Sequence, residues 1–387
     1  MTQNMPASAL RVGFDLRRMH RTGIGRYARN IFSAVVAECP THEYLAVVQS
    51  ADDAAWAEQR GATVRAIVAP AVQYSPQEML RVPRRARGVD VWHSPHPYQL
   101  GLGGPPVVLT LHDTIQLSHA IGWKNRLARR PLHAIMATST HRAAGLIANS
   151  NTTRQAFHEW LGVPLDRVHV AHLAPEPVLA AEPDAMEIAA ARIRWTLPGR
   201  VVLYVGMTQP HKNLLRLLEA VGLLVREPGY DDVVLAIVGP WVPSQQGPLR
   251  ARMTQLGLEP LVRFLGTLKE ADLAVVYRVA DVLVQPSLVE GFGLTVVEAM
   301  QAGTPVVVSD IPVFREIVAD AAVLVDPLVP ASIAGGLRAV LGDRERASAL
   351  ARRGRLVGGR LNWRATAETT LRVYAAAVSA PFNGRTR

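Results

Sequence analysis

Short apolar runs alternate along the chain with longer segments of helical character. In the first half these runs are rich in valine, leucine and isoleucine, and they occupy residues 10–14, 44–48, 64–68, 89–93, 107–111, 145–148 and 168–171. Short, largely apolar runs are typical of strands buried on both faces of a parallel sheet. The first half therefore predicts an α/β domain with helices on both faces of its sheet.

The second half repeats this alternation more clearly. Strands are predicted at residues 201–205, 233–238, 262–265, 282–285, 306–309 and 322–325, with helices between them that include residues 213–225 and 294–302. The pattern weakens over residues 175–198, which hold four prolines and an acidic stretch, so we expect the interdomain linker there. The predicted architecture is two doubly wound, Rossmann-like α/β domains that face a central cleft, with ligands bound beyond the carboxyl ends of the strands.

Composition narrows the class of protein. Apolar residues make up 49% of the 387 residues and charged residues 19%, as in soluble globular proteins. No apolar run reaches the length of a membrane span, and residues 1–10 lack the basic start and apolar stretch of a signal peptide. The single cysteine, Cys39, excludes an intramolecular disulfide and a multi-cysteine metal site. These features favour a cytoplasmic protein.

The net charge of +10 would suit nucleic acid, anionic lipid or a phosphorylated substrate. No helix-turn-helix, zinc-finger or aromatic RNA-binding signature accompanies the charge, so nucleic acid is not an expected partner. Basic residues separated by apolar ones fill residues 123–142, and a second group consists of Arg81, Arg84, Arg85 and Arg87. They could contact the inner face of an anionic membrane or a lipid-diphosphate acceptor, and a solvated basic surface explains them equally well.

The segment over residues 285–300 carries the strongest chemical signal. A predicted strand ends at Pro286, a glycine-rich loop follows, and a helix is predicted from about Leu294. Glycines let main-chain amides approach a ligand, and a helix N-terminus favours a negatively charged group. If the segment were helical throughout, Glu290 and Glu298 would lie roughly 12 Å apart along the axis. That is more than the about 5–9.5 Å of a glycosidase pair, and it suits two hydroxyl-rich rings joined by a diphosphate. A glutamate at a helix start plus an exposed helical one is the alternative.

This Glu-x7-Glu pattern, followed by Ala299-Met300 and by Gly-Thr-Pro-Val-Val at residues 303–307, resembles the donor site of family 4 retaining glycosyltransferases of the GT-B fold. The resemblance covers nearly the whole chain and is strongest over residues 201–326. It implies that Glu290 contacts the donor hexose, that Glu298 holds the ribose hydroxyls, and that loop amides contact sugar and phosphate, namely those of Gly291, Phe292, Gly293 and Leu294. It also implies an acceptor domain over residues 1–180, a donor domain over 181–362, and a last helix over 363–387 that packs back on the first domain.

The loop over residues 205–213 is the second element of the predicted donor site. Gly206 ends a strand, and Lys212 stands at the start of the next helix, where its ammonium group can neutralise a diphosphate leaving group. Many members of the family have arginine where this chain has Met207, so Lys212 is expected to carry more of the phosphate charge. A solvated lysine is the alternative.

Two weaker elements also resemble the family. The turn with Gly23 and Gly25 is similar to the first strand-to-helix loop, whose amides approach the donor diphosphate, although a plain turn is an alternative. Residues 262–266 resemble the segment whose main chain binds the nucleobase, which places Arg263 among the donor-binding residues.

Strand-end histidines mark the predicted ligand side of the first domain. His93 and His112 each end a predicted strand, and His112, followed by Asp113, matches the histidine at the family's catalytic centre. His112 could hydrogen-bond the donor sugar through its ring or its main chain and orient the acceptor. A buried structural histidine is the alternative.

His93, Asp113 and Arg154 are candidates for the acceptor side, whereas Asn149 or Ser150 fits a helix cap better. No metal site is expected, because no His-x-x-x-His pair on a helix appears.

Together these features predict retaining transfer of a hexose from a nucleotide sugar to a glycan or lipid-linked acceptor, without metal or cofactor. GDP-mannose and surface polysaccharide synthesis are favoured, because many bacterial relatives with a similar Lys-Asn loop are mannosyltransferases; UDP-hexose and deoxyhexose donors stay open. A nucleotide-sugar epimerase of the same fold is the nearest alternative. A basic scaffold or nucleic-acid-binding protein would not need Glu290. An oxidoreductase is disfavoured, since neither half has a full Gly-x-Gly-x-x-Gly loop.

Overall fold

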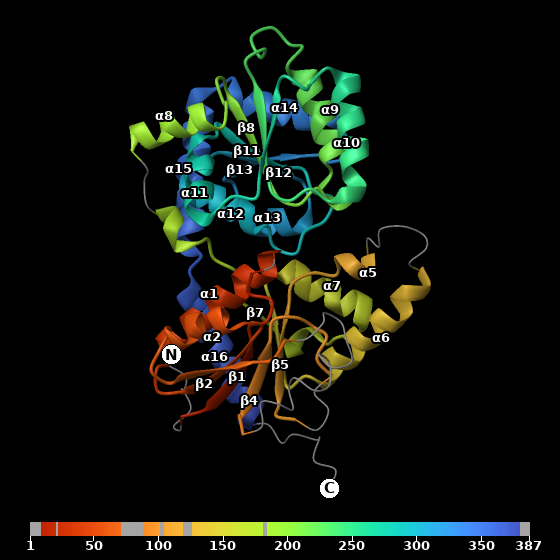
Figure 1. Ribbon diagram of the computed structural model, residues 1–387. Helices are drawn as coiled ribbons and strands as arrows, with labels where there is room; N and C mark the ends of the chain where they lie inside the picture. Colours follow the sequence, from red (N-terminus) through yellow and green to blue (C-terminus); the bar gives the residue numbers. More distant parts are fainter. Residues whose placement is uncertain are drawn as a thin grey trace. The chain divides into compact units, whose positions relative to one another are not determined.

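The computed structural model describes residues 9–20, 22–70, 88–100, 104–118, 126–180 and 184–379. The chain forms two compact units (Figure 1). Unit 1 combines the chain up to Leu173 with the segment from Asn362 onward, and unit 2 extends from Ala174 to Leu361. The first boundary therefore lies between residues 173 and 174, where the sequence had suggested 180 and 181.

Among the described residues, unit 1 contains a seven-stranded parallel sheet with the strand order β3-β2-β1-β4-β5-β6-β7. Most of its strands are short apolar runs whose side chains are buried on both faces, as continuous apolar patterns favour. The strands are β1 (Arg11–Asp15), β2 (Glu43–Val48), β3 (Val64–Val68), β4 (Val91–Ser94), β5 (Val107–Leu111), β6 (Gly145–Ala148) and β7 (Val168–Val170).

The last helix of the chain, α16 (Trp363–Ser379), belongs to unit 1 and packs against α1 (Thr22–Glu38) and β6. A side-chain carbon on Gly145 of β6 would lie 2.5 Å from Val373 of α16, so the missing side chain allows the close approach. Figure 1 shows α16, in blue, beside the red and orange N-terminal elements. The other helices are α2 (Ala51–Glu58), α5 (Ile115–Ser118), α6 (Arg126–Arg142), α7 (Asn151–Leu161) and the short η2 (Leu165–Arg167).

Unit 2 contains, within its described residues, a six-stranded parallel sheet with the order β10-β9-β8-β11-β12-β13. Its central strands are fully buried, and β8 and β9 pair in register from Val201 with Val234 to Val205 with Val238. The strands are β8 (Val201–Val205), β9 (Val234–Val238), β10 (Val262–Gly266), β11 (Val282–Gln285), β12 (Val306–Ser309) and β13 (Ala322–Val325).

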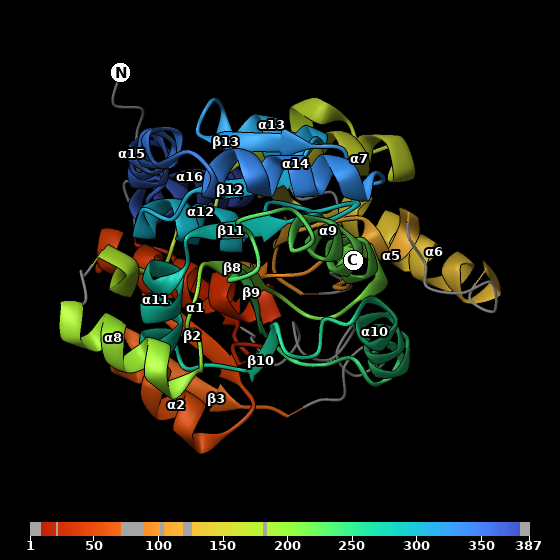
Figure 2. The same ribbon diagram turned by 90° about the horizontal axis from the view of Figure 1, so that it is seen from above.

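Helices cover both faces of this second sheet (Figure 2). On one face α9 and α14 pack together above apolar side chains of β8, β9 and β11, while elsewhere α11 contacts α8 and α12 contacts α15. The helices are η3 (Pro177–Ala180), α8 (Ala185–Arg194), η4 (Pro210–Lys212), α9 (Leu214–Leu224), α10 (Pro243–Leu256), α11 (Glu270–Val279), α12 (Leu294–Ala302), α13 (Pro312–Val318), α14 (Pro330–Leu341) and α15 (Arg344–Arg360).

Both sheets are doubly wound, which confirms the predicted fold class. The strand order reverses between β1 and β4 in unit 1 and between β8 and β11 in unit 2. In open α/β sheets, ligands bind beyond the carboxyl ends of the strands at such reversals. The candidate residues are therefore sought at these ends. Over the described ranges, no helix combines the length and the apolar character needed to span a membrane.

Candidate functional site

Three glycines end three neighbouring strands of unit 2. Gly206, Gly239 and Gly266 follow or close β8, β9 and β10, and the Gly239 amide donates to the Gly266 carbonyl over 2.8 Å. A side-chain carbon on Gly239, whose φ is +130°, would lie 2.2 Å from the carbonyl oxygen of Gly206. Only glycine fits here, so the strand ends close tightly. The sequence singled out Gly206 alone, although an apolar run followed by glycine recurs in all three strands.

The loop after β8 is tied to the loop after β11. Asn213 adopts a left-handed conformation with φ of +64°, and its side-chain amide donates to the carbonyls of Pro286 and Pro327 over 3.0 and 2.7 Å. The Leu288 amide donates to the His211 carbonyl over 2.8 Å. These bonds fix Lys212, which lies between His211 and Asn213, next to the glutamate loop.

One carboxylate oxygen of Glu290 accepts three hydrogen bonds. Its Oε1 accepts from Lys212 Nζ over 2.6 Å, from Ser287 Oγ over 2.8 Å and from Gln285 Nε2 over 3.1 Å. The side chains of Glu290 and Lys212 are 9% and 19% exposed, so the ion pair is shielded from water yet open at its rim. Oε2 carries none of these three bonds. Ser287 and Gln285 are members of the site that the sequence did not single out.

Electrostatics keep Glu290 ionised. Burial alone would raise the pKa of its carboxyl group, but the Lys212 ammonium and the hydrogen bonds from Lys212 and Ser287 outweigh burial, so the pKa lies below its ordinary value of 4.5. The structure thus brings together the two residues expected to hold hexose and diphosphate. In this structure the two side chains pair with each other.

The glycine loop turns sharply into α12. Gly293 precedes the helix with φ of +95°, and no side chain caps the helix start through a hydrogen bond. A side-chain carbon on Gly293 would lie 2.5 Å from the ring of Phe314, so this position requires glycine on two counts. Because α12 begins at Leu294, Glu290 lies in the loop. This agrees with the predicted helix start at about Leu294, so the condition of a helix throughout is not met and the distance along a helix axis does not apply.

Glu298 is enclosed. It lies in the middle of α12 with no exposed surface, and its Oε2 accepts from the Tyr277 hydroxyl of α11 over 2.8 Å. One oxygen of this carboxylate is therefore bonded to the neighbouring helix α11. Tyr277 left no signal in the sequence, because the contact depends on how α11 packs on α12.

The Arg263 side chain points away from the carboxyl end of its strand. Its guanidinium donates to the carbonyls of Pro260 and Thr196 over 2.7 and 3.2 Å. Both lie before the start of β10, so the side chain is committed at the opposite end of the strand from Gly266. A part for Arg263 in donor binding is therefore left to its main chain, as the resemblance implies.

In unit 1, Gly23 and Gly25 lie in the first turn of α1, and the expected free turn is absent from this described segment. A side-chain carbon on Gly25 would lie 2.5 Å from the Arg18 carbonyl oxygen. Gly25 therefore lets the helix start pack closely on the preceding loop, and the amides near a ligand would be those of a helix N-terminus.

A buried charged cluster fixes that loop at the end of β1. The Arg17 guanidinium contacts Asp15 over 2.6 Å with both side chains nearly fully buried, and His96 and Gln99 from the segment after β4 face the same carboxylate. Burial raises the pKa of Asp15, but Arg17 and His96 together hold it well below its usual range. This cluster occupies the strand-order reversal of unit 1. Charges directly after an apolar strand were the signal for it.

His93 is a structural residue. Its Nδ1 lies 2.6 Å from the Tyr374 hydroxyl and its Nε2 lies 2.8 Å from Thr110 Oγ1, and the side chain has no exposed surface. Burial lowers the pKa of His93 to about 3, so the ring is neutral. Both ring nitrogens are committed inside the core, which corrects the expectation of an acceptor-side role.

His112, directly after β5, is held by its main chain. The His112 carbonyl accepts from Asn149 Nδ2 over 3.0 Å and from Thr153 Oγ1 over 3.1 Å. Burial lowers the pKa of the His112 ring to about 4, although a hydrogen bond to the Pro95 carbonyl opposes the shift. The ring Nε2 is buried and has no hydrogen-bond partner among the described residues. The ring Nε2 is therefore a part of His112 that can receive a ligand.

The remaining candidates have local roles or none that the structure assigns. Asp113 accepts from the Ile115 amide over 3.0 Å and shapes the turn before α5. Ser150 caps α7 by accepting from the Thr153 amide over 2.9 Å, so the cap is Ser150 and Asn149 serves His112 instead. Arg154 lies half-buried in the first turn of α7.

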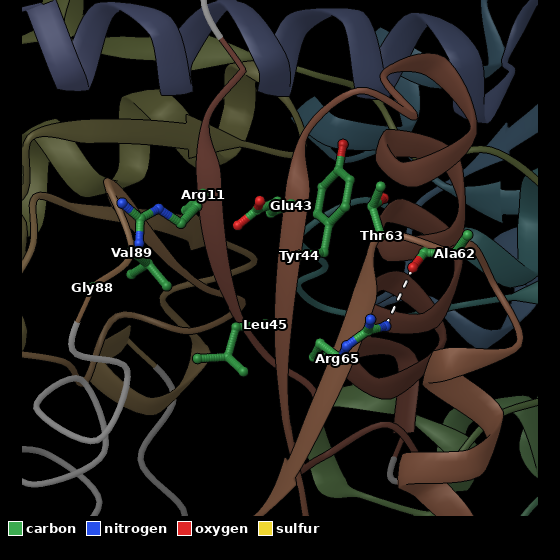
Figure 3. A pocket seen from close by; sticks show the side chains of 9 residues that line it. All are labelled: Arg11, Glu43, Tyr44, Leu45, Ala62, Thr63, Arg65, Gly88 and Val89. Atoms are coloured by element: carbon green, nitrogen blue, oxygen red, sulfur yellow. Dashed lines mark hydrogen bonds between the residues drawn. The ribbon is translucent and has the colours of Figure 1, made fainter.

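A cavity of about 480 Å³ lies at the amino ends of the first strands of unit 1, opposite to the carboxyl ends. Figure 3 shows the Arg11 side chain directed toward Gly88 and Val89, and the Arg65 side chain directed toward Ala62, with Glu43 between them. The two cations diverge, so they do not converge on one ligand atom as binding sites require.

Of the basic stretches, residues 81–87 and 123–125 lie outside the described residues, and residues 126–142 form α6. The described ranges contain no group of three or more histidine, cysteine or acidic side chains that could hold a metal ion.

Comparisons with known proteins identify the family of this chain. Residues 187–357 match the family model "Glycosyl transferases group 1", and residues 21–174 match "Glycosyltransferase Family 4". A phosphatidyl-myo-inositol mannosyltransferase of Mycobacterium leprae is 33% identical over 289 residues, which cover 69% of this chain and 72% of that protein. A D-inositol 3-phosphate glycosyltransferase of Kineococcus radiotolerans is 34% identical over 250 residues, which cover 60% of this chain but only 57% of that protein.

Solved structures show the same fold at lower identity. Anabaena HepE in complex with UDP and glucose matches with a TM-score of 0.74 and 19% identity, covering 95% of this chain and 99% of that one. A sucrose-phosphate synthase from Thermosynechococcus elongatus matches with a TM-score of 0.77 and 20% identity, covering 95% and 98%. With its two Rossmann-like units and these relatives, the chain belongs to the family 4 glycosyltransferases of the GT-B fold.

Proposed function

We propose that this protein transfers a hexose from a nucleotide sugar bound by unit 2 to an acceptor bound by unit 1, with retention of the anomeric configuration. The observation that carries the proposal is the ion pair between Lys212 and Glu290. It joins the loops after β8 and β11, the two strands between which the sheet order reverses. A partly buried cation and a partly buried carboxylate at this place suit a ligand that has both a diphosphate and a hydroxyl-rich ring.

Donor binding exchanges partners in this pair. The Lys212 ammonium turns to the diphosphate, and the start of α12 offers main-chain amides to the same group. Glu290, still held by Ser287 and Gln285, accepts hydrogen bonds from hexose hydroxyls. As the bond between the anomeric carbon and the diphosphate oxygen breaks, its electron pair goes to the diphosphate, whose charge Lys212 and the amides stabilise. The acceptor hydroxyl oxygen forms the new bond to the anomeric carbon from the same face, and its proton goes to the departing diphosphate oxygen. The reaction then needs no metal ion.

The donor that we favour is GDP-mannose, and the acceptor a glycan or a lipid-linked sugar in surface polysaccharide synthesis. The relative from Mycobacterium leprae, named a phosphatidyl-myo-inositol mannosyltransferase, supports a mannosyl donor. The fold neighbour HepE has been solved with UDP-glucose, which keeps a uridine donor as the alternative. We place the protein in the cytoplasm, where an anionic membrane surface would present a lipid-linked acceptor to its basic residues.

A thermal-shift panel of GDP, UDP, dTDP and ADP sugars tests the donor, because a ligand that binds only the folded state raises its stability by mass action. We expect stabilisation by one nucleotide class. In a separate turnover assay, the protein should slowly release the nucleoside diphosphate of that class, and the rate of release should be the same when a metal chelator is present. If none of the nucleotide sugars stabilised the protein, the proposed donor site would be contradicted. Release of an epimeric sugar in place of the diphosphate would show an epimerase.

A further inference from the structure

Four buried polar side chains of unit 1 form a continuous chain from the last helix to the first. The Tyr374 hydroxyl of α16 lies 2.6 Å from His93 Nδ1, His93 Nε2 lies 2.8 Å from Thr110 Oγ1, and Thr110 Oγ1 lies 2.7 Å from the Tyr27 hydroxyl of α1. All four residues are at most 1% exposed. The chain therefore runs from α16 over β4 and β5 to the adjacent helix α1, along one face of the sheet and without contact with water.

These three hydrogen bonds depend on one another. His93 is neutral, because burial lowers its pKa to about 3, so one ring nitrogen donates and the other accepts. If one hydroxyl is removed, a neighbouring buried group loses its partner, which is costly away from water. The chain is thus a rigid unit whose geometry is set by all four members.

The Tyr27 end of this chain contacts His112. The two rings meet edge to face, with centroids 4.8 Å apart and an interplanar angle of 75°. Asn149 and Thr153 hold the His112 main chain, so Tyr27 and Pro95 are left to set the ring. Pro95 has no N–H, so the atom that it contributes to this bond is its carbonyl oxygen. A carbonyl oxygen only accepts hydrogen bonds, so the ring must donate.

The direction of that bond fixes the tautomer. Nε2 is the ring nitrogen without a hydrogen-bond partner in the described part of the chain, so the bond to Pro95 involves Nδ1, which carries the hydrogen. Nε2 then presents a lone pair in a buried position. A buried acceptor without a partner is unfavourable, and a hydroxyl group of a ligand would satisfy it.

We propose that the chain Tyr374–His93–Thr110–Tyr27 positions the His112 ring so that its Nε2 accepts a hydrogen bond from a hydroxyl of the sugar ligand in unit 1. This inference rests on the proposed function, since it assumes a hydroxyl-bearing ligand. The four members of the chain touch no ligand and are positioning residues; His112 makes the contact.

The test compares Tyr27→Phe with Tyr44→Phe. Tyr27→Phe keeps the ring that packs on His112 and removes only the hydroxyl that joins the chain. Tyr44 is the matched control, because it is equally buried in unit 1, but its hydroxyl donates to the main-chain carbonyls of Val35 and Cys39 over 2.8 and 2.9 Å. Both variants should lose similar thermal stability.

Two readouts separate positioning from mere stability. In ¹⁵N-histidine spectra, with the His112 signals assigned through His112→Gln, wild type should show hydrogen on Nδ1 of His112. Tyr27→Phe should shift or broaden those signals, and Tyr44→Phe should leave them unchanged. Turnover should fall about tenfold or more in Tyr27→Phe alone, with nucleotide affinity unaltered, since small displacements near reacting groups cost that much.

Each failure has its own signature. If Tyr27→Phe and Tyr44→Phe give the same histidine spectra and the same turnover, the positioning role is overturned even when the wild type is an active transferase. Hydrogen on Nε2 of His112 in the wild type would overturn the assigned tautomer. If the wild type turns over no nucleotide sugar, the proposed function fails, while the spectra still decide whether the chain positions His112.

Discussion

At the scale of single residues, the ion pair of Lys212 and Glu290 determines what a substitution at either position does. Lys212 Nζ lies 2.6 Å from Glu290 Oε1 where the loops after β8 and β11 meet, and both side chains are largely shielded from water. Removal of one group therefore leaves the other with an uncompensated charge in a shielded position. Binding of a diphosphate would compensate only one of the two possible losses. The two single variants should therefore respond to ligand in different ways.

Lys212→Met should lower turnover about 100-fold, because it removes the group that stabilises the leaving diphosphate. Loss of its partner should also leave Glu290 uncompensated and lower the free energy of unfolding by about 1–3 kcal/mol. Steady-state kinetics and urea unfolding measure the two effects. The control is Arg252→Met, which breaks a 2.8 Å ion pair with Glu219 on α9 and should leave turnover unchanged. Equal turnover in Lys212→Met and Arg252→Met would contradict the role of Lys212.

The lowered pKa of Glu290 makes part of the stability depend on pH. The carboxyl group titrates near 4.5 in the unfolded chain and lower in the folded protein, so its contribution is complete above 4.5. The contribution declines as the pH falls below 4.5 and is lost as the pH passes through the folded value. The difference in unfolding free energy between wild type and Glu290→Gln should therefore stay constant from about pH 7 to about pH 5.5 and shrink as the pH falls below 4.5 in urea titrations. A difference that stayed constant below pH 4.5 as well would contradict this assignment.

Residue roles could be predicted where a side chain stands in a local pattern. Glu290 and Lys212 follow predicted strands in glycine-rich or helix-starting loops, and both lie in the site. Asn213 and Tyr277 escaped prediction because their partners are distant in sequence; Asn213 bonds to Pro327, 114 residues away. No local pattern reports such a contact.

At the scale of elements, the left-handed start of α12 is the feature most sensitive to change. Gly293→Ala should cost about 1–2 kcal/mol for its positive φ. The crowding against Phe314 should add about 1–3 kcal/mol. Gly229→Ala is the control, because Gly229 also has a positive φ of +82° but a side-chain carbon there would meet nothing within 4 Å. Denaturant unfolding of both variants isolates the contact with Phe314. Equal losses would show that the loop moves aside without cost.

The apolar runs predicted the strands well, and each predicted strand appears within a residue or two of its expected range. Continuous burial on both faces is a strong local signal. The resemblance that placed Arg263 in the donor site concerned the main chain of its segment, so it carried no information on where the Arg263 side chain points. The local pattern predicted the start of α12 near Leu294, but it could not show the contact of Gly293 with Phe314.

At the scale of the whole molecule, unit 1 needs the last helix of the chain to complete its core. Truncation after Leu361 removes α16, including Val373 and Tyr374, and should abolish cooperative unfolding of unit 1. Unit 2 should still be stabilised by the nucleotide. Calorimetry with and without nucleotide measures both units, and truncation after Ser379, which retains α16, is the control. Unaltered unfolding of unit 1 after removal of α16 would contradict this dependence.

The hydrogen bond between His93 and Tyr374 joins residues 281 positions apart. During synthesis at about 5–20 residues per second, roughly 14–56 s pass between translation of these two residues. Unit 2 is therefore fully synthesised while unit 1 still lacks α16. A nascent chain in that state exposes the apolar surface that α16 later covers, so its yield in the cell should depend on chaperones that bind the incomplete N-terminal domain until α16 has been made.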